Sequence, residues 1–264
     1  DLQHFTGKST SKTGLYVKMI FGGLAGYLIM MFIVIYGNMV MRSVIEEKTN
    51  RVIEIIISSV KPYQLMMGKI LGNTLAGILQ FSVWIFIGYV LLQLAGSWMY
   101  PAHHETLEMA GKGMMGEILS EIQQLPLAFM TLSFLFYFVG GYLLYSSIYA
   151  AIGAAVDSET DTQQFMLPII LPLILGVYVG FFTVIENPHG TVSTVFSFIP
   201  FTSPIVMLMR IPFGVPWWQW IISLLLLLAT YLLVVWIAAK IYRIGILMYG
   251  KKPSYRELLR WLKY

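Results

Sequence analysis

VIEEKTNRVIEIIISSVKPYQLMMGKILG (Val44–Gly72) is the densest group of mixed charge in the chain, and it lies between two long apolar segments. Only 11% of the 264 residues are charged, against about 25% in soluble domains. The hydrophobic fraction is 58%, so the composition indicates an integral membrane protein. Charge gathered between two membrane-length segments indicates either a docking surface or a solvated elbow.

Five apolar segments are each long enough to cross a hydrocarbon core of about 30 Å as a helix. We predict an all-α integral membrane fold with transmembrane helices at Leu15–Met41, Leu65–Leu94, Pro126–Val156, Phe165–Val184 and Trp217–Ile241. Residues 1–14 are polar and are expected to be a linker or the end of an extracytoplasmic region. The transmembrane domain is expected to cover residues 15–245. Residues 246–264 form a basic tail, in which an S-x-x-E box at Ser254 predicts an amphipathic helix.

The elbow is expected to cover residues 42–63, with a short helix inside it from Asn50 to Ser58. Arg51 and Glu54 fall on one side of this helix, and its branched apolar residues fall largely on the other. Pro62 ends the elbow.

A second short element precedes the last span, in PFTSPIVMLMRIP (Pro200–Pro212). Ser203 is the expected N-cap and Pro204 the first helical residue, and the helix should end before Pro212. Eight residues cover only about 12 Å, yet they are nearly all apolar. This pattern predicts a re-entrant or interfacial hairpin. For Arg210 two readings stay open, a side chain that snorkels to the interface and a role in substrate binding.

Lys and Arg residues divide unevenly between the two sides of this topology. The side with the elbow and the C-terminal tail holds 12 of the 17, at Arg42, Lys48, Arg51, Lys61, Lys69, Lys240, Arg243, Lys251, Lys252, Arg256, Arg260 and Lys263. The positive-inside rule therefore places the elbow and the C-terminus in the cytoplasm.

The sequence contains few residues or motifs suited to catalysis or to ion coupling. The central parts of the spans hold no Asp, Glu, Lys, Arg or His, whereas ion-coupled carriers usually keep ionisable groups at mid-membrane. No HExxH or GxxxxGK[ST] motif and no cysteine occur. His103, His104 and Glu105 are adjacent on a loop, an arrangement that rarely supplies three ligands to one metal ion. We therefore identify no catalytic site, metal site or cofactor of this chain itself, and expect energy to enter from a cytoplasmic partner docked on the elbow.

The elbow and the hairpin together resemble ABC-2-type permeases, the membrane subunits of ABC exporters, and most closely their sodium-efflux-like branch. In that family a charged run leads into a short coupling helix, a proline and a span that opens with Gly-Lys, here Gly68 and Lys69. The resemblance covers about Leu15 to Tyr264. It implies six spans in the full protein, of which the first, with an extracytoplasmic domain, is not in this sequence.

The resemblance also implies partners and site residues. The partners would be a cytoplasmic ABC ATPase that binds ATP and Mg²⁺, a second permease copy or paralogue, and membrane lipids, with no nucleic acid. The protein would lie in the bacterial inner membrane. The residues expected to contact the ATPase are Glu46, Glu47, Lys48, Asn50, Arg51 and Glu54, with a second contact at Asp157, Glu159 and Asp161. Two alternatives stay open, a membrane scaffold or assembly factor that does not transport and an intramembrane hydrolase.

Overall fold

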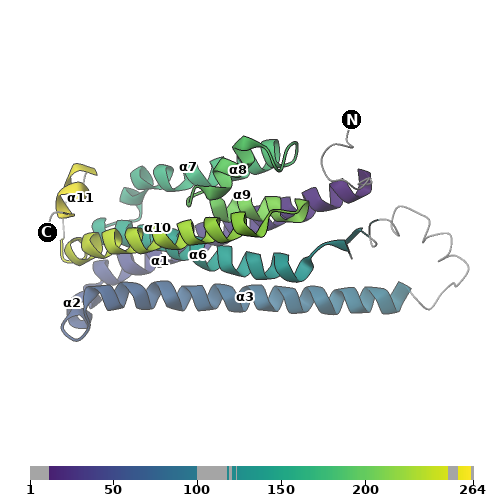
Figure 1. Ribbon diagram of the computed structural model, residues 1–264. Helices are drawn as coiled ribbons and strands as arrows, with labels where there is room; N and C mark the ends of the chain where they lie inside the picture. The colour runs from purple at the N-terminus through teal and green to yellow at the C-terminus, as the bar shows by residue number, and fades with distance from the viewer. Residues whose placement is uncertain (1–11, 100–117, 119–120, 123, 249–254, 263–264) are drawn as a thin grey trace, which may run out of the picture.

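The computed structural model describes residues 12–99, 118, 121–122, 124–248 and 255–262, and all regular secondary structure in these residues is helical. Five helices in this part of the chain are long and apolar enough to cross a membrane, as the sequence predicted. They lie side by side along one direction (Figure 1). These are α1 (Lys12–Thr49), α3 (Pro62–Met99), α6 (Leu127–Ala155), α10 (Trp217–Gly245) and a helix over Thr160–Val184 whose main part is α7 (Gln163–Val179).

Shorter elements connect the long helices. A 3₁₀ turn (η2, Thr160–Thr162) precedes α7, and a π-helical segment (η3, Gly180–Val184) continues it. The remaining elements are α2 (Val52–Ile57), α8 (Thr191–Phe198), α9 (Ser203–Arg210), the 3₁₀ turn η4 (Ile211–Phe213) and α11 (Tyr255–Trp261).

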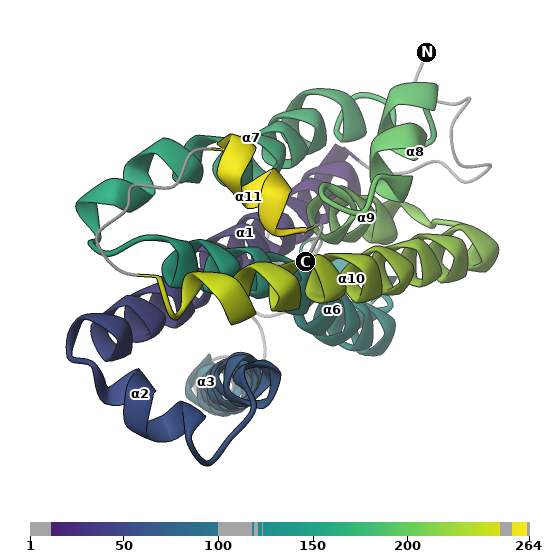
Figure 2. The ribbon, with the colours of Figure 1, turned by 90° about the vertical axis from the view of Figure 1, so that its left-hand side faces the viewer.

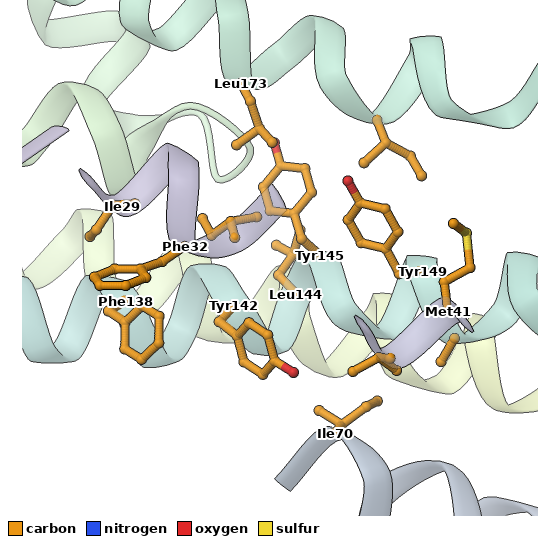
Figure 3. Close-up of a cluster of buried hydrophobic side chains, with 14 of the residues drawn as sticks. Ile29, Phe32, Met41, Ile70, Phe138, Tyr142, Leu144, Tyr145, Tyr149 and Leu173 are labelled. Atoms are coloured by element: carbon orange, nitrogen blue, oxygen red, sulfur yellow. The ribbon is translucent and has the colours of Figure 1, made fainter. Parts of the chain in front are cut away.

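The centre of the bundle is α6, which packs against α1 on one side and α10 on the other (Figure 2). Its buried face carries large aromatic side chains, among them Phe138, Tyr142, Tyr145 and Tyr149, which pack between helices (Figure 3). The Tyr145 hydroxyl donates a hydrogen bond to the carbonyl oxygen of Phe201 at 2.7 Å. A buried hydroxyl is costly without such a partner, so this bond fixes α6 against the turn before α9.

Glycines set the closest helix approaches. A Cβ built on Gly22 of α1 would lie 2.7 Å from the carbonyl oxygen of Met209 in α9, and one built on Gly26 would meet the Met209 side chain. At the other end of α1, a Cβ on Gly153 of α6 would lie 2.7 Å from the carbonyl oxygen of Met41. Gly22 and Gly26, four residues apart on α1, therefore permit close packing of α9 on α1.

Several predicted boundaries were wrong; α3, for example, begins at Pro62 rather than Leu65. Two of the differences have a clear structural reason. The first span was expected to end at Met41, but α1 continues through residues 42–49. It does so because Val44, Ile45 and Lys48 are buried and keep that stretch packed against the bundle. The N-cap of α9 is Thr202 rather than Ser203, and its hydroxyl donates to the Phe196 carbonyl at 2.6 Å.

The end of the bundle that carries α2 also carries α11 (Figure 1). Helix α11 forms within the predicted basic tail, and its Leu258 lines a cavity of about 200 Å³ with residues of α6, α7 and α10. The Lys240 ammonium of α10 donates to the Leu262 carbonyl at 3.0 Å. His103, His104 and Glu105 lie outside the described residues.

Candidate docking and coupling site

The turn between α1 and α2 consists of two residues, Asn50 and Arg51. Arg51 adopts left-handed backbone angles (φ 55°, ψ 14°), which are uncommon for a residue other than glycine. The Arg51 amide donates to the Lys48 carbonyl at 3.0 Å, and the Asn50 amide donates to the Glu46 carbonyl at 3.0 Å. Helix α2 therefore follows α1 without a flexible linker.

Helix α2 presents a mixed surface. Ile53 is fully buried, whereas Glu54 is exposed, Val52 is 42% exposed and Ile55 is 75% exposed. Glu46, Asn50 and Arg51 are exposed beside it. We call the exposed residues Glu46, Asn50, Arg51, Val52, Glu54 and Ile55 the α2 surface. It combines both signs of charge with apolar side chains, which suits a protein interface.

Lys48 points into the bundle rather than toward α2. Its side chain is 1% exposed, and its ammonium lies 2.9 Å from the Asp157 carboxylate. The same ammonium donates to the carbonyl oxygens of Ala154 at 2.8 Å and Val156 at 3.1 Å. These carbonyls are at the C-terminal end of α6, where unpaired carbonyls and the helix dipole favour a cation. Lys48 thus joins the end of α1 to the end of α6.

A second contact joins α1 to α3. The Lys69 ammonium lies 2.6 Å from the Glu47 carboxylate and donates to the Ser43 hydroxyl at 2.6 Å. Lys69 is 10% exposed and Glu47 is 28% exposed at the side chain, so water screens this pair less than a surface pair. The sequence placed Lys69 at the edge of the span but did not pair it with Glu47.

The acidic connection after α6 makes contacts within the chain. Glu159 pairs with Arg42 of α1 at 3.4 Å, and both side chains are about half exposed. Asp161 accepts a hydrogen bond from the Ser158 hydroxyl at 2.7 Å. Of the three acidic residues predicted as a second contact, Glu159 is thus the one whose carboxylate is most open to a partner.

The hairpin α8–α9 lies toward the other end of the bundle and surrounds Arg210. Every residue of α9 is buried. The Arg210 guanidinium is fully buried and donates to the Pro188 carbonyl (2.7 Å), the Ser197 hydroxyl (2.6 Å), the Thr194 hydroxyl (3.1 Å) and the Gln219 side-chain oxygen (2.9 Å). Of the two readings left open for Arg210, a side chain that snorkels to the surface is wrong, because its hydrogen bonds hold it inside.

The other predicted hairpin residues frame this buried segment. Pro200 lies in the turn between α8 and α9, Ser203 and Pro204 begin α9, and Pro212 lies in η4 after the helix has ended. Gly214 follows with a positive φ of 85°, a conformation that glycine adopts readily. This turn leads the chain into α10.

The intramembrane hydrolase alternative would need an activated nucleophile or a metal site. Ser147 is buried, and its hydroxyl donates to the Leu143 carbonyl at 2.7 Å in its own helix. Within the ranges that the structure describes, no group of three His, Cys, Asp or Glu side chains could hold a metal ion.

The sequence prediction missed the exposure of Val52 and Ile55. A signal was present, because α2 reads VIEIII and a single-sided contact cannot bury five apolar residues of a six-residue helix.

Comparison with known proteins gives consistent matches over the whole chain. The family model described as ABC-2 family transporter protein matches residues 3–240. The Bacillus subtilis protein YhaP, itself uncharacterised, is 30% identical over 97% of this chain and 58% of its own length. The uncharacterised Methanocaldococcus jannaschii protein MJ1024 is 23% identical over 96% of this chain and 57% of its own length. No solved structure matches significantly.

The chain thus spans less than two thirds of the length of these relatives. The family match nevertheless covers most of this chain, including the five long apolar helices nearly to the end of α10. The chain is a multi-pass membrane protein that belongs to the ABC-2 family of transporters.

Proposed function

We propose that this chain is the permease subunit of an ATP-driven exporter and that a cytoplasmic ATPase binds the α2 surface. The observation that carries the proposal is the connection of α2 to the bundle. One short exposed helix is tied through adjacent residues Glu47 and Lys48 to both α3 and α6. ATP and Mg²⁺ would bind the ATPase and not this chain.

The α2 surface would form the contact with the ATPase. Its exposed side chains include Glu54, Arg51 and the two apolar residues Val52 and Ile55. An apolar centre with charged neighbours is the usual composition of a specific protein interface. On the predicted orientation this surface lies in the cytoplasm, where the ATPase would be.

Lys48, which is buried, and the Glu47–Lys69 pair, which is partly buried, would transmit the motion. Since α2 follows α1 after only two residues, a displacement of α2 moves the end of α1 with it. Lys48 then acts on α6 through Asp157, and Glu47 acts on α3 through Lys69. Motion of the ATPase would in this way tilt three spans together and open or close a path between two copies of the permease.

The remaining features of the proposal follow the family. The functional unit would contain two permease chains, identical or paralogous, in the bacterial inner membrane, with the C-terminus in the cytoplasm. Residues 15–245 would form the transmembrane domain, with α8–α9 as its extracytoplasmic re-entrant hairpin. The alternatives of a scaffold or an intramembrane hydrolase have no observation in the described residues that favours them.

The test is co-purification of the permease with its ATPase and measurement of stimulated ATP hydrolysis. We expect Ile55→Asp and Glu54→Lys to reduce association at least about tenfold, as substitutions at the centre of an interface do. The matched control is Glu186→Lys, which reverses an exposed carboxylate in the segment between η3 and α8. Unchanged association and unchanged stimulated ATP hydrolysis in both α2 variants would refute the coupling role.

A further inference from the structure

Two cavities lie on the face that α1 shares with α7. The first, of about 290 Å³, is polar and lies next to η2; among its lining residues are Asn38 and Arg42 of α1, and Glu159, Thr160 and Gln163. The second, of about 490 Å³, is lined by apolar and aromatic side chains, at Met30, Ile174, Val177, Tyr178, Phe181 and Phe182. One face of the bundle thus has a polar cavity and an apolar cavity.

On both α1 and α7, residues that line the polar cavity and residues that line the apolar cavity lie on the same side of the helix. Met41 lines the polar cavity and Met30 the apolar cavity, eleven residues apart on α1. Met166 and Val177 have the same separation on α7. Eleven residues are about three turns and about 16 Å of helix, so residues with this spacing share one side. The cavities therefore lie on the same side of both helices, about 16 Å apart, and we call them the polar end and the apolar end of this face.

The polar end holds one positively charged and one negatively charged side chain. The Arg42 guanidinium and the Glu159 carboxylate lie 3.4 Å apart, and their side chains are 57% and 51% exposed. An exposed pair of this kind is weak, so each group can turn to a ligand at little cost. Asn38 and Gln163 add neutral donors and acceptors beside it. Because one positive and one negative group are present, a ligand with both charges fits better than a simple anion or cation.

The apolar end suits a hydrocarbon chain. Its aromatic side chains Tyr178 and Phe182 pack against each other with ring centroids 4.5 Å apart, and both remain exposed. Burying hydrocarbon against such a surface is favourable in proportion to the area removed from water. A ligand that used both ends would have a charged head near η2 and an apolar tail toward η3.

We propose that this face binds a zwitterionic amphiphile of the phospholipid type, and that this is the substrate class of the exporter. The head would contact Arg42 through its anionic group and Glu159 through its cationic group, and the tail would lie along α7. This substrate role rests on the proposed permease function, whereas binding itself does not. The polar end is at the α2 side of the bundle, so the amphiphile would enter from the cytoplasmic leaflet.

Binding can be tested without ATP or ATPase, in vesicles of phosphatidylglycerol, which lacks the cation, with a small share of a phosphatidylethanolamine that carries a photoactivatable acyl chain. We expect labelling to concentrate on residues 174–182 and near Met30. Unlabelled phosphatidylethanolamine should compete for labelling about tenfold better than phosphatidylglycerol. The double variant Arg42→Gln/Glu159→Gln should lower labelling about tenfold, as expected for loss of a hydrogen bond to a charged group.

Control variants separate this site from general lipid contact. Val177→Trp fills the apolar cavity and should abolish labelling, while Leu232→Trp on α10, which is 63% exposed, should leave it unchanged. Labelling that is equal on α10 and α7, or equal in wild type and the double variant, would overturn the proposal. The chain has no cysteine, so Val177→Cys reports a second copy on this face: disulfide-linked dimers without lipid labelling would also overturn it. Because this experiment contains no ATPase, a negative result would refute lipid binding without affecting the proposed coupling to the ATPase, which is tested separately.

Discussion

Lys48 and Asp157 form an ion pair at 2.9 Å that joins the last turn of α1 to the residues that follow α6. The two residues are far apart in the sequence, and the lysine is almost fully buried. The pair places a charged contact between two helices at the end of the bundle where α2 lies. Loss of either partner would leave the other without its main charged contact.

Lys48→Met should destabilise the protein by about 2 kcal/mol, because the Ala154 and Val156 carbonyls and Asp157 lose their shared donor. Thermal unfolding in detergent would measure the effect. Lys61→Met, at an exposed lysine, is the matched control. Equal stability of the two variants would show that the buried lysine does not hold the helix ends together.

Glu47→Gln should lower ATP-driven transport more than it lowers ATPase binding, because Glu47 contacts Lys69 of α3 and is largely turned away from solvent. We expect ATPase association within about twofold of wild type but an ATP-driven transport rate at least about tenfold lower, comparable to the loss of one charge-assisted hydrogen bond. Transport into inverted vesicles and co-purification measure the two quantities. A parallel fall in both would place Glu47 in the docking surface instead.

Arg210→Met should destabilise the hairpin by about 3 kcal/mol, because Pro188, Thr194, Ser197 and Gln219 would lose their donor inside the fold. Arg210→Lys should recover part of this loss, since an ammonium keeps the charge but cannot span four acceptors in a fork. Limited proteolysis between residues 185 and 203 and thermal unfolding would detect the change. The control Arg51→Met, at an exposed arginine, should leave the stability almost unchanged. If Arg210→Met resisted proteolysis as well as wild type does, the hydrogen bonds of Arg210 would not be what stabilises the hairpin.

Gly153→Ala should destabilise the bundle by about 1–3 kcal/mol, because the added methyl group would lie 2.7 Å from the backbone oxygen of Met41 and must push α1 away from α6. The matched control is Gly72→Ala on α3, where nothing lies within 4 Å of the added carbon. That change should be neutral or stabilising by up to about 1 kcal/mol through helix propensity. A similar response at both glycines would contradict the close α1–α6 packing.

The five long helices could be predicted because hydrophobic length alone identifies a span. The extension of α1 to Thr49 could not, since residues 42–49 look solvated until Lys48 is seen to reach the carbonyls of α6. The same holds for Arg210, whose oxygen acceptors are spread over Pro188 to Gln219 and show no charge pattern in the sequence. Charge can be located from sequence, but the direction in which a long cationic side chain points depends on partners brought in by the fold.

The Arg210 hydrogen bonds have a consequence for how the protein is made. A cation that enters a bilayer without partners is costly, but every acceptor of Arg210 lies between Pro188 and Gln219. Only the first turn of α10 is needed to complete the set. The segment from Pro188 to Gln219 therefore contains all the hydrogen-bond acceptors that stabilise this charge. The hairpin can fold as one unit as soon as the first turn of α10 has been synthesised.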